Sequence, residues 1–223
     1  TKNSLMNPKK KILIITECFY PEEFKINDIA LWWINYGFDV DVLTLNPSYP
    51  KGKIFKGYNN YLFSSDYYNG IKIFRIITLL GYNNNLFKKI LKYFIFTILG
   101  SIFTLRYGNK YDYVFGFNTS SLTNMVPAVL IKKIYKKPLM LWVQDLWPES
   151  VYAYGFKKTK FLEYFLNLFV NFIYKNVTVY GISSKGFESV LRKYVNNHVK
   201  IFYLPNWADD FNQNLDPILL NEN

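Results

Sequence analysis

The chain has 223 residues, half of them hydrophobic and 20% aromatic, which argues against a disordered protein and allows a substantial core. Its 27 lysines and arginines against 16 acidic residues give a formal net charge of +11, which favours an anionic partner: nucleic acid, a phosphorylated small molecule or an acidic lipid surface. A single cysteine and a single histidine exclude a disulfide framework and a cysteine-rich zinc site, and any histidine-dependent catalysis would rest on His198 alone.

Apolar runs of strand length alternate with segments of helical period along the chain. Continuous apolar strands separated by helices are typical of a parallel sheet covered on both faces, so the sequence predicts a Rossmann-like α/β fold. In chain order the predicted elements are strand 11–16, helix 26–36, strand 39–45, strand 71–77, helix 86–107, strand 112–117, helix 122–135, strand 139–143, helix 161–174, strand 177–182, helix 184–194 and strand 200–205.

Polar loops follow four of the predicted strands. Ligands of such sheets bind beyond the carboxyl ends of the strands, near the switch in strand order, so we expect these loops to form the functional edge. They read ECFYPEEFKIND after the first strand, NPSYPKG after the second, FNTSS after the fourth and QDLWPES after the fifth.

The sequence disfavours a dinucleotide site and a metal site. None of the 11 glycines forms a G-x-G pair, and the loop TECFYPEEF has no glycine that would let a backbone approach a pyrophosphate. The D-x-D of Asp39 and Asp41 lies at the start of a strand, opposite the expected ligand edge, with no further oxygen ligands nearby. We therefore expect no cofactor and no bound metal.

Residues 86–108 combine lysines with a long apolar stretch. The 13 residues from Tyr93 to Leu105 carry no charge, which is too few for the ~20 that span a bilayer. One interpretation is a helix partly buried against the sheet. The other is a helix lying in the headgroup region, with Lys88, Lys89 and Lys92 on anionic phosphates.

We expect an anionic membrane surface, and not nucleic acid, as a partner. Residues 161–175 repeat the apolar, aromatic character of the earlier helix. Basic and aromatic residues are interleaved in 87–93 and 132–137, but these lysines have the spacing of an ordinary solvated helix face, and no RRM, OB or helix-turn-helix pattern occurs. No secretory signal is evident, so we expect a cytoplasmic protein, peripheral on the inner face of the cell membrane.

Five blocks of the sequence resemble, in the same order, the amino-terminal half of a bacterial glycosyltransferase. They are ILIITECFYPEEFKINDIA, VLTLNPSYPKGKIFKGY, LWVQDLWPES, ISSKGFES and YLPNWADD, and they cover about Lys11 to Asp210. The family is the retaining, GT-B-fold one that includes phosphatidylinositol mannosyltransferase and sucrose synthase. The blocks are most similar to its WbuB-type members, which are associated with polysaccharide and O-antigen assembly.

The resemblance implies one half of a two-domain enzyme. In this family the amino-terminal Rossmann-like domain binds the acceptor. The carboxyl-terminal domain binds the nucleotide sugar and carries two glutamates separated by seven residues, a spacing absent here. We therefore expect residues 1–10 to be a disordered or non-native start, 11–208 the acceptor-binding domain and 209–223 the start of an interdomain linker, with the donor domain absent from the chain.

The resemblance also gives candidate site residues. Relatives often carry a histidine and an acidic residue where Gln144 and Asp145 stand, so these two are the candidate catalytic residues. Asp145 can accept from a sugar hydroxyl or stabilise positive charge at the anomeric carbon, whereas Gln144 can only donate and accept hydrogen bonds. The candidate substrate-binding residues are Lys25, Asn27, Asp28, Tyr49, Lys53, Asn118, Thr119, Trp147 and Glu149.

Structural alternatives exist for several of these residues. Asn27 or Asp28 can be the N-cap of the first helix, and Asn118 and Thr119 can cap a later one. Trp147 suits packing in the core as well as stacking on an acceptor ring. The polar side chains alone do not decide between these roles.

Two functions remain open. The first is the acceptor-binding domain of a membrane-associated glycosyltransferase, which transfers a sugar from a nucleotide sugar to a polyprenyl-diphosphate-linked saccharide in surface polysaccharide, O-antigen or capsule synthesis. Lys25 would then face a phosphate of the acceptor, and this chain alone would turn over poorly or not at all. The second is a non-catalytic module that binds anionic lipid or nucleic acid through its basic, aromatic face.

Overall fold

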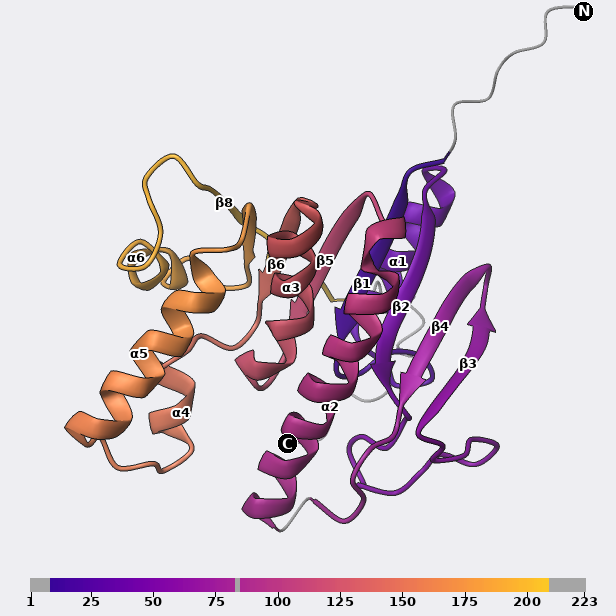
Figure 1. The fold of residues 1–223 in the computed structure, drawn as a ribbon, viewed down its shortest axis with the longest axis horizontal. Helices are drawn as coiled ribbons and strands as arrows, with labels where there is room; N and C mark the ends of the chain where they lie inside the picture. The colour runs from indigo at the N-terminus through magenta and orange to yellow at the C-terminus, as the bar shows by residue number, and fades with distance from the viewer. Residues whose placement is uncertain (1–8, 83–84, 209–223) are drawn as a thin grey trace, which may run out of the picture.

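The strands form one sheet in the order β3-β4-β2-β1-β5-β6-β7-β8 in the computed structural model, which describes residues 9–82 and 85–208 (Figure 1). Neighbouring strands are parallel except for β3, which runs antiparallel to β4 at one edge. The strands are β1 (Lys11–Thr16), β2 (Asp39–Leu45), β3 (Phe63–Tyr68), β4 (Ile71–Ile76), β5 (Tyr113–Asn118), β6 (Leu139–Val143), β7 (Val179–Ile182) and β8 (Lys200–Tyr203).

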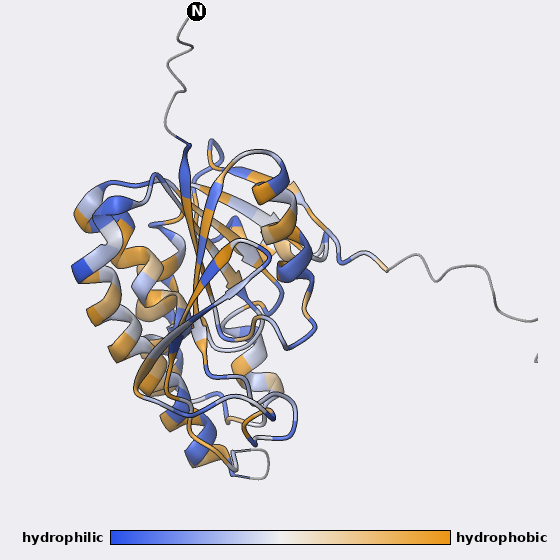
Figure 2. Cartoon of the chain, turned by 90° about the vertical axis from the view of Figure 1, so that its right-hand side faces the viewer, coloured by the Kyte–Doolittle hydropathy of each residue, from blue (hydrophilic) through white to orange (hydrophobic). Residues whose placement is uncertain are grey.

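Helices cover both faces of the sheet, as Figure 2 shows from the β3 side. The first helix buries Ile26 and Ile29 in the apolar cluster on one face, and the second and third helices bury Phe96 and Ile131 in the cluster on the other. This arrangement confirms the predicted Rossmann-like α/β fold. The helices are α1 (Lys25–Asn35), α2 (Leu86–Tyr107), α3 (Val126–Tyr135), α4 (Glu149–Ala153), α5 (Lys160–Tyr174) and α6 (Phe187–Leu191), with 3-10 turns η1 (Gly108–Lys110) and η2 (Leu122–Met125).

Burial on both sides explains why the central strands read as unbroken apolar runs. In β1, Leu13 and Ile15 belong to the cluster beneath α2 and α3, whereas Ile12 and Ile14 belong to the cluster beneath α1. Successive side chains of a strand point to opposite faces, so a strand covered on both faces needs apolar residues at every position.

The hairpin of β3 and β4 is the main difference from the predicted elements. The residues of β3 alternate between exposed and half-buried, so this edge strand lacks the apolar run that marks the others. The turn is Asn69–Gly70, with φ of 47° and 85°, and an Asn-Gly pair between two strands is itself a hairpin signal. The other predicted boundaries agree to within two residues, with two exceptions. Residues 122–125 of helix 122–135 form the 3-10 turn η2, and only Phe187–Leu191 of helix 184–194 is α-helical.

Parallel pairing brings the ends of three strands to one edge. Thr16 of β1 pairs with Phe117 of β5, and Asn118 of β5 pairs with Val143 of β6. The residues that follow β1, β5 and β6 therefore start at the same level of the sheet. This edge is the one where the sequence predicts the functional loops.

Gly116 in β5 provides a test of how tightly the sheet packs beneath η2. A Cβ at this position would lie 2.6 Å from Met125 Sδ and 3.0 Å from Leu141 Cδ1. We expect Gly116→Ala to lower the free energy of unfolding by about 1–3 kcal/mol, because an overpacked core must shift to admit the methyl group. Urea denaturation measures the change.

Gly186→Ala is the matched control, because a Cβ there would contact only Ser184 Oγ, at 3.8 Å. This variant should stay within about 0.5 kcal/mol of the parent protein. Equal stability of the two variants would contradict the packing described for β5.

Candidate functional site

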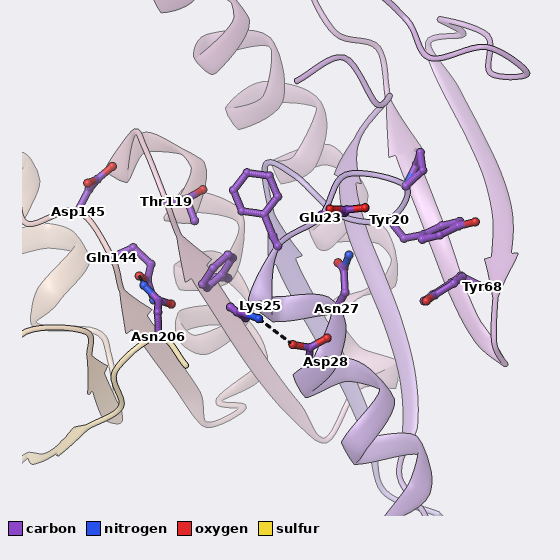
Figure 3. Close-up of a pocket in the computed structure, with 13 residues that line it drawn as sticks. Tyr20, Glu23, Lys25, Asn27, Asp28, Tyr68, Thr119, Gln144, Asp145 and Asn206 are labelled. Atoms are coloured by element: carbon purple, nitrogen blue, oxygen red, sulfur yellow. Dashed lines mark hydrogen bonds and ion pairs between the residues drawn. The ribbon is translucent and has the colours of Figure 1, made fainter. Parts of the chain in front are cut away.

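A cleft of about 720 Å³ lies at the carboxyl ends of β1, β5 and β6. Figure 3 shows Gln144, Asp145 and Asn206 on one side of it, Tyr20 and Tyr68 on the other. The cleft combines carboxylates, amides, a lysine and several aromatic rings. Its lining residues are Tyr20, Pro21, Glu23, Phe24, Lys25, Asn27, Asp28, Tyr68, Phe117, Thr119, Gln144, Asp145 and Asn206.

The cleft gathers more than half of the candidate residues from the sequence. Both candidate catalytic residues line it, although they are far in sequence from the residues of α1. The candidates that line the cleft are Lys25, Asn27, Asp28, Thr119, Gln144 and Asp145.

The other candidates lie outside the lining of the cleft. Tyr49 lines a neighbouring pocket of about 250 Å³, and Trp147 lines an apolar pocket of about 340 Å³. Lys53 and Glu149 are exposed. Asn118 is 1% exposed, so its role is to hold other residues rather than to contact a ligand directly.

Asn118 holds the backbone of the two candidate catalytic residues. The N–H groups of Gln144 and Asp145 donate to the Asn118 carbonyl at 3.0 and 3.3 Å. The Asn118 side-chain amide in turn donates to the Asp145 carbonyl at 3.0 Å. These three bonds fix the direction in which the chain leaves β6 and place both side chains in the cleft.

The half-buried position of Asp145 changes its ionisation. Burial raises the pKa of the Asp145 carboxyl above its usual range, and the charge of Glu17 adds to this effect, whereas Lys89 opposes it. Gln144 accepts a hydrogen bond from Asn206 at 2.7 Å through Oε1. Its Nε2 is buried and has no hydrogen-bond partner among the described residues.

Lys25 and Asp28 form a second group with Trp207. Lys25 Nζ lies 3.7 Å from Asp28 Oδ2 and 5.7 Å from the centre of the Trp207 ring. The Trp207 indole N–H donates to the same Asp28 oxygen at 3.2 Å. Asn206 and Trp207, which the sequence does not single out, thus connect the segment after β8 to the cleft.

The N-cap alternatives for the polar residues are wrong. Helix α1 begins at Lys25 with Phe24 as its N-cap, so Asn27 and Asp28 lie within its first turn, and the Asn27 amide donates to the Glu22 carbonyl at 2.8 Å. The 3-10 turn η2, which follows β5, is capped by Ser121 rather than by Asn118 or Thr119.

A buried polar network lies behind the cleft and is absent from the sequence predictions. Glu17, the first residue after β1, accepts hydrogen bonds from the Lys92 ammonium, the Ser120 hydroxyl and the Asn124 amide. Burial lowers the pKa of Lys92, but the charge and hydrogen bond of Glu17 outweigh this and raise it above 10.5. Lys92 is 3% exposed, so its predicted contact with lipid phosphate is wrong.

The D-x-D carboxylates are neutralised at the opposite edge of the sheet. Lys11 Nζ lies 2.8 Å from Asp39 Oδ2 and 3.2 Å from Asp41 Oδ2, and the Tyr111 hydroxyl donates to Asp41 at 2.8 Å. Residues 9–82 and 85–208 contain no group of three or more His, Cys, Asp or Glu side chains that could hold a metal ion.

Solved structures of GT-B glycosyltransferases have a similar fold, although no family model and no curated protein matches the chain in sequence. A structure of sucrose-phosphate synthase from Thermosynechococcus elongatus is 11% identical with a TM-score of 0.55, over 90% of this chain and 91% of that one. A structure of E. coli trehalose-6-phosphate synthase bound with UDP-2-fluoro glucose is 7% identical with a TM-score of 0.50, over 82% of this chain and 42% of that one. At these identities the similarity concerns the fold.

The Glu17–Lys92 pair should be essential for stability. We expect Lys92→Met to lower the free energy of unfolding by about 3–5 kcal/mol, because it leaves the Glu17 charge buried without its partner. The double variant Glu17→Gln/Lys92→Met should recover most of this loss, as measured by urea denaturation. Because the folded pKa of Lys92 is raised, the pair stabilises the protein below pH 10.5 and less as the pH rises through the folded value.

Lys88→Met is the control, since Lys88 is an exposed lysine one turn earlier in α2. It should change stability by less than about 0.5 kcal/mol. A Lys92→Met variant as stable as this control would contradict the buried ion pair.

Proposed function

We propose that this chain is the acceptor-binding half of a GT-B glycosyltransferase of the WbuB type. The observation that carries the proposal is the polar, aromatic cleft at the carboxyl ends of β1, β5 and β6. Carboxylates and amides exchange hydrogen bonds with sugar hydroxyls, and aromatic rings pack on the apolar faces of sugar rings. The fold shared with sugar-transferring enzymes supports the same conclusion.

Asp145 and Gln144 have distinct roles in this proposal. Asp145 accepts a hydrogen bond from the acceptor hydroxyl or stabilises the positive charge that develops at the anomeric carbon of the transferred sugar. The side-chain amide of Gln144, which lines the cleft, exchanges hydrogen bonds with sugar hydroxyls. Asn118 acts on both residues through the backbone and keeps their side chains in the cleft.

In this proposal the nucleotide sugar binds mainly to a second domain. The predicted start of the linker to it, residues 209–223, lies outside the described residues. The loop after β1 contains no glycine, and such a loop does not offer the close backbone approach that a diphosphate needs. A separate donor domain would supply this contact. The cleft of this chain would then form the acceptor wall of the complete active site.

Three adjoining pockets support a lipid-linked saccharide as the acceptor. The cleft shares Phe24 and Thr119 with the pocket of about 250 Å³ that also holds Tyr49. That pocket shares Lys89 and Tyr154, among others, with the apolar pocket between α2, α4 and α5. A saccharide in the cleft would therefore be continuous with a charged group near Lys89 and an apolar chain beyond it.

Exposed apolar residues favour attachment to the inner face of the cell membrane. They recur every three or four positions along α2, which places them on one face of that helix, and a shorter row occurs on α5. No helix in the described part of the chain has the length and apolarity to cross a bilayer. These two rows consist of Phe87, Leu91, Phe94, Ile98, Ile102 and Leu105 on α2 and Phe161, Tyr164, Phe165 and Leu168 on α5.

The substitution Asp145→Asn, made in the complete natural gene product, tests the enzymatic role of this carboxylate. We expect transfer of sugar to extracted lipid-linked saccharide to fall about 100-fold, because the amide cannot stabilise positive charge. The free energy of unfolding of Asp145→Asn should instead rise at neutral pH. Burial raises the folded pKa of Asp145, so the ionised carboxylate destabilises the native state at neutral pH. This effect declines as the pH falls through the raised folded pKa and is absent below the ordinary pKa of 3.8.

Asp112→Asn is the matched control, since Asp112 is at the amino end of β5, on the opposite edge of the sheet. Its rate of transfer should equal that of the parent protein. Asp145→Asn with an unchanged rate would remove this carboxylate from the site.

The row of apolar residues on α2 should control membrane binding. We expect Phe94→Gln/Ile98→Gln to lower the fraction bound to vesicles of anionic phospholipid on the order of tenfold in a flotation assay, because it removes two large apolar side chains from the lipid contact. The control Tyr67→Gln/Phe202→Gln removes exposed apolar residues from β3 and β8 instead. Equal loss of binding in both variants would exclude α2 as the contact surface.

A further inference from the structure

We propose that the cleft selects its sugar by charge: it takes an uncharged or amino-bearing sugar and rejects one that carries a carboxylate or a phosphate. This inference rests on the proposed function, because it names the class of saccharide that the acceptor site accepts. It also revises the expected role of Lys25, which the sequence pairs with an acceptor phosphate.

The cleft is acidic although the chain as a whole is strongly basic. Its lining contains the carboxylates of Glu23, Asp28 and Asp145 and a single ammonium group, that of Lys25. The formal net charge of the whole chain is +11. A cleft with walls of low dielectric concentrates the field of its own charges, so a ligand inside it experiences the local negative charge rather than the distant positive charge.

The Lys25 ammonium is already engaged by protein groups. It lies 3.7 Å from Asp28 Oδ2 and above the ring of Trp207, whose indole N–H donates to the same Asp28 oxygen. An anionic sugar would have to compete with Asp28 for this cation. The geometry therefore makes Lys25 a partner of the cleft wall instead of a phosphate ligand.

Three further cations close to the cleft do not reverse its sign. The Arg75 guanidinium donates to the carbonyl of the lining residue Tyr20, but it is paired with Asp66. Lys92 is buried and paired with Glu17, so the charges of each pair cancel. Lys89 lies 4.6 Å from the centre of the Tyr154 ring, in the neighbouring pocket, and it lowers the pKa of Asp145 from there. Counting Lys89 still leaves three carboxylates against two ammonium groups.

Aromatic rings add to the preference for positive charge. Tyr20 and Tyr68 are stacked with ring centres 3.8 Å apart at the side of the cleft that holds Glu23 (Figure 3). The negative face of an aromatic ring attracts cations and does not attract anions. A protonated amino group would thus meet carboxylates and π-electrons on the same side.

The negative cleft and the positive charge of Lys89 beside it suit a ligand that has an uncharged or amino-bearing sugar at one end and an anionic group at the other. Its anionic linker would remain near Lys89, outside the cleft, while only its uncharged or amino-bearing sugar enters. The basic residues elsewhere on the chain would then attract an anionic surface without filling the cleft. One molecule can in this way carry a positive surface and a negative site.

Saturation-transfer NMR on the 223-residue chain tests the inference with three probes at pH 6: methyl glucosaminide, methyl N-acetylglucosaminide and methyl glucuronide. We expect the glucosaminide to bind at least about fivefold more tightly than the glucuronide, which is the effect of one charge pair at close range in water. The neutral probe should lie between them. Equal affinities, or a preference for the glucuronide, would overturn the inference and leave the proposed function intact.

Reversing one charge in the cleft distinguishes the effect of the cleft's own charge on sugar affinity from the effect of the protein's net charge. Glu23→Lys should lower the ratio of glucosaminide to glucuronide affinity at least fivefold, because it reverses one charge of the lining. Glu188→Lys changes the net charge equally but on α6, away from the cleft, and should leave the ratio within twofold. Two outcomes would contradict both the proposed acceptor cleft and its charge preference. One is that Glu23→Lys leaves the affinities of all three probes unchanged, and the other is that no probe binds.

Discussion

The parallel pairing of β1, β5 and β6 is the constraint on which the cleft depends. Thr16, Phe117 and Asn118 hold positions in a continuous register, so the residues that follow each strand emerge together at one edge. A slip of one residue would turn every side chain of a strand to the opposite face. In β1 such a slip would break two sets of packing contacts, because Leu13 and Ile15 belong to one apolar cluster and Ile12 and Ile14 to the other.

Two buried polar groups convert this common edge into a defined site. Glu17 connects the end of β1 to the loop after β5 and to α2, through Ser120, Asn124 and Lys92. Asn118 connects the end of β5 to the segment after β6. Burial of these groups is tolerated because both Glu17 oxygens and the Asn118 amide nitrogen make hydrogen bonds, although Asn118 Oδ1 has no partner among the described residues. These bonds hold the loops more rigidly than apolar contacts alone would hold them.

The succession of strands and helices along the chain and the edge of the sheet that holds the site follow from simple patterns, whereas the contacts within the site do not. Apolar runs and the ligand-edge rule are enough to place Gln144 and Asp145 with the residues of α1. The pairing of Lys92 with Glu17, 75 positions apart, is not visible in the sequence because a lysine in an amphipathic helix usually faces solvent. The edge strand β3 lacks an apolar run, and only its Asn-Gly turn reveals it.

Hydrogen–deuterium exchange tests the central claim, that saccharide binds where these three strands end. Extracted lipid-linked saccharide added to the protein should slow exchange in peptides covering residues 19–28, 117–120 and 143–147, which contribute most of the cleft lining. Protection of all three segments together is the predicted result. Protection confined to other parts of the chain, such as the β3 edge or α6, would contradict the assignment of this cleft.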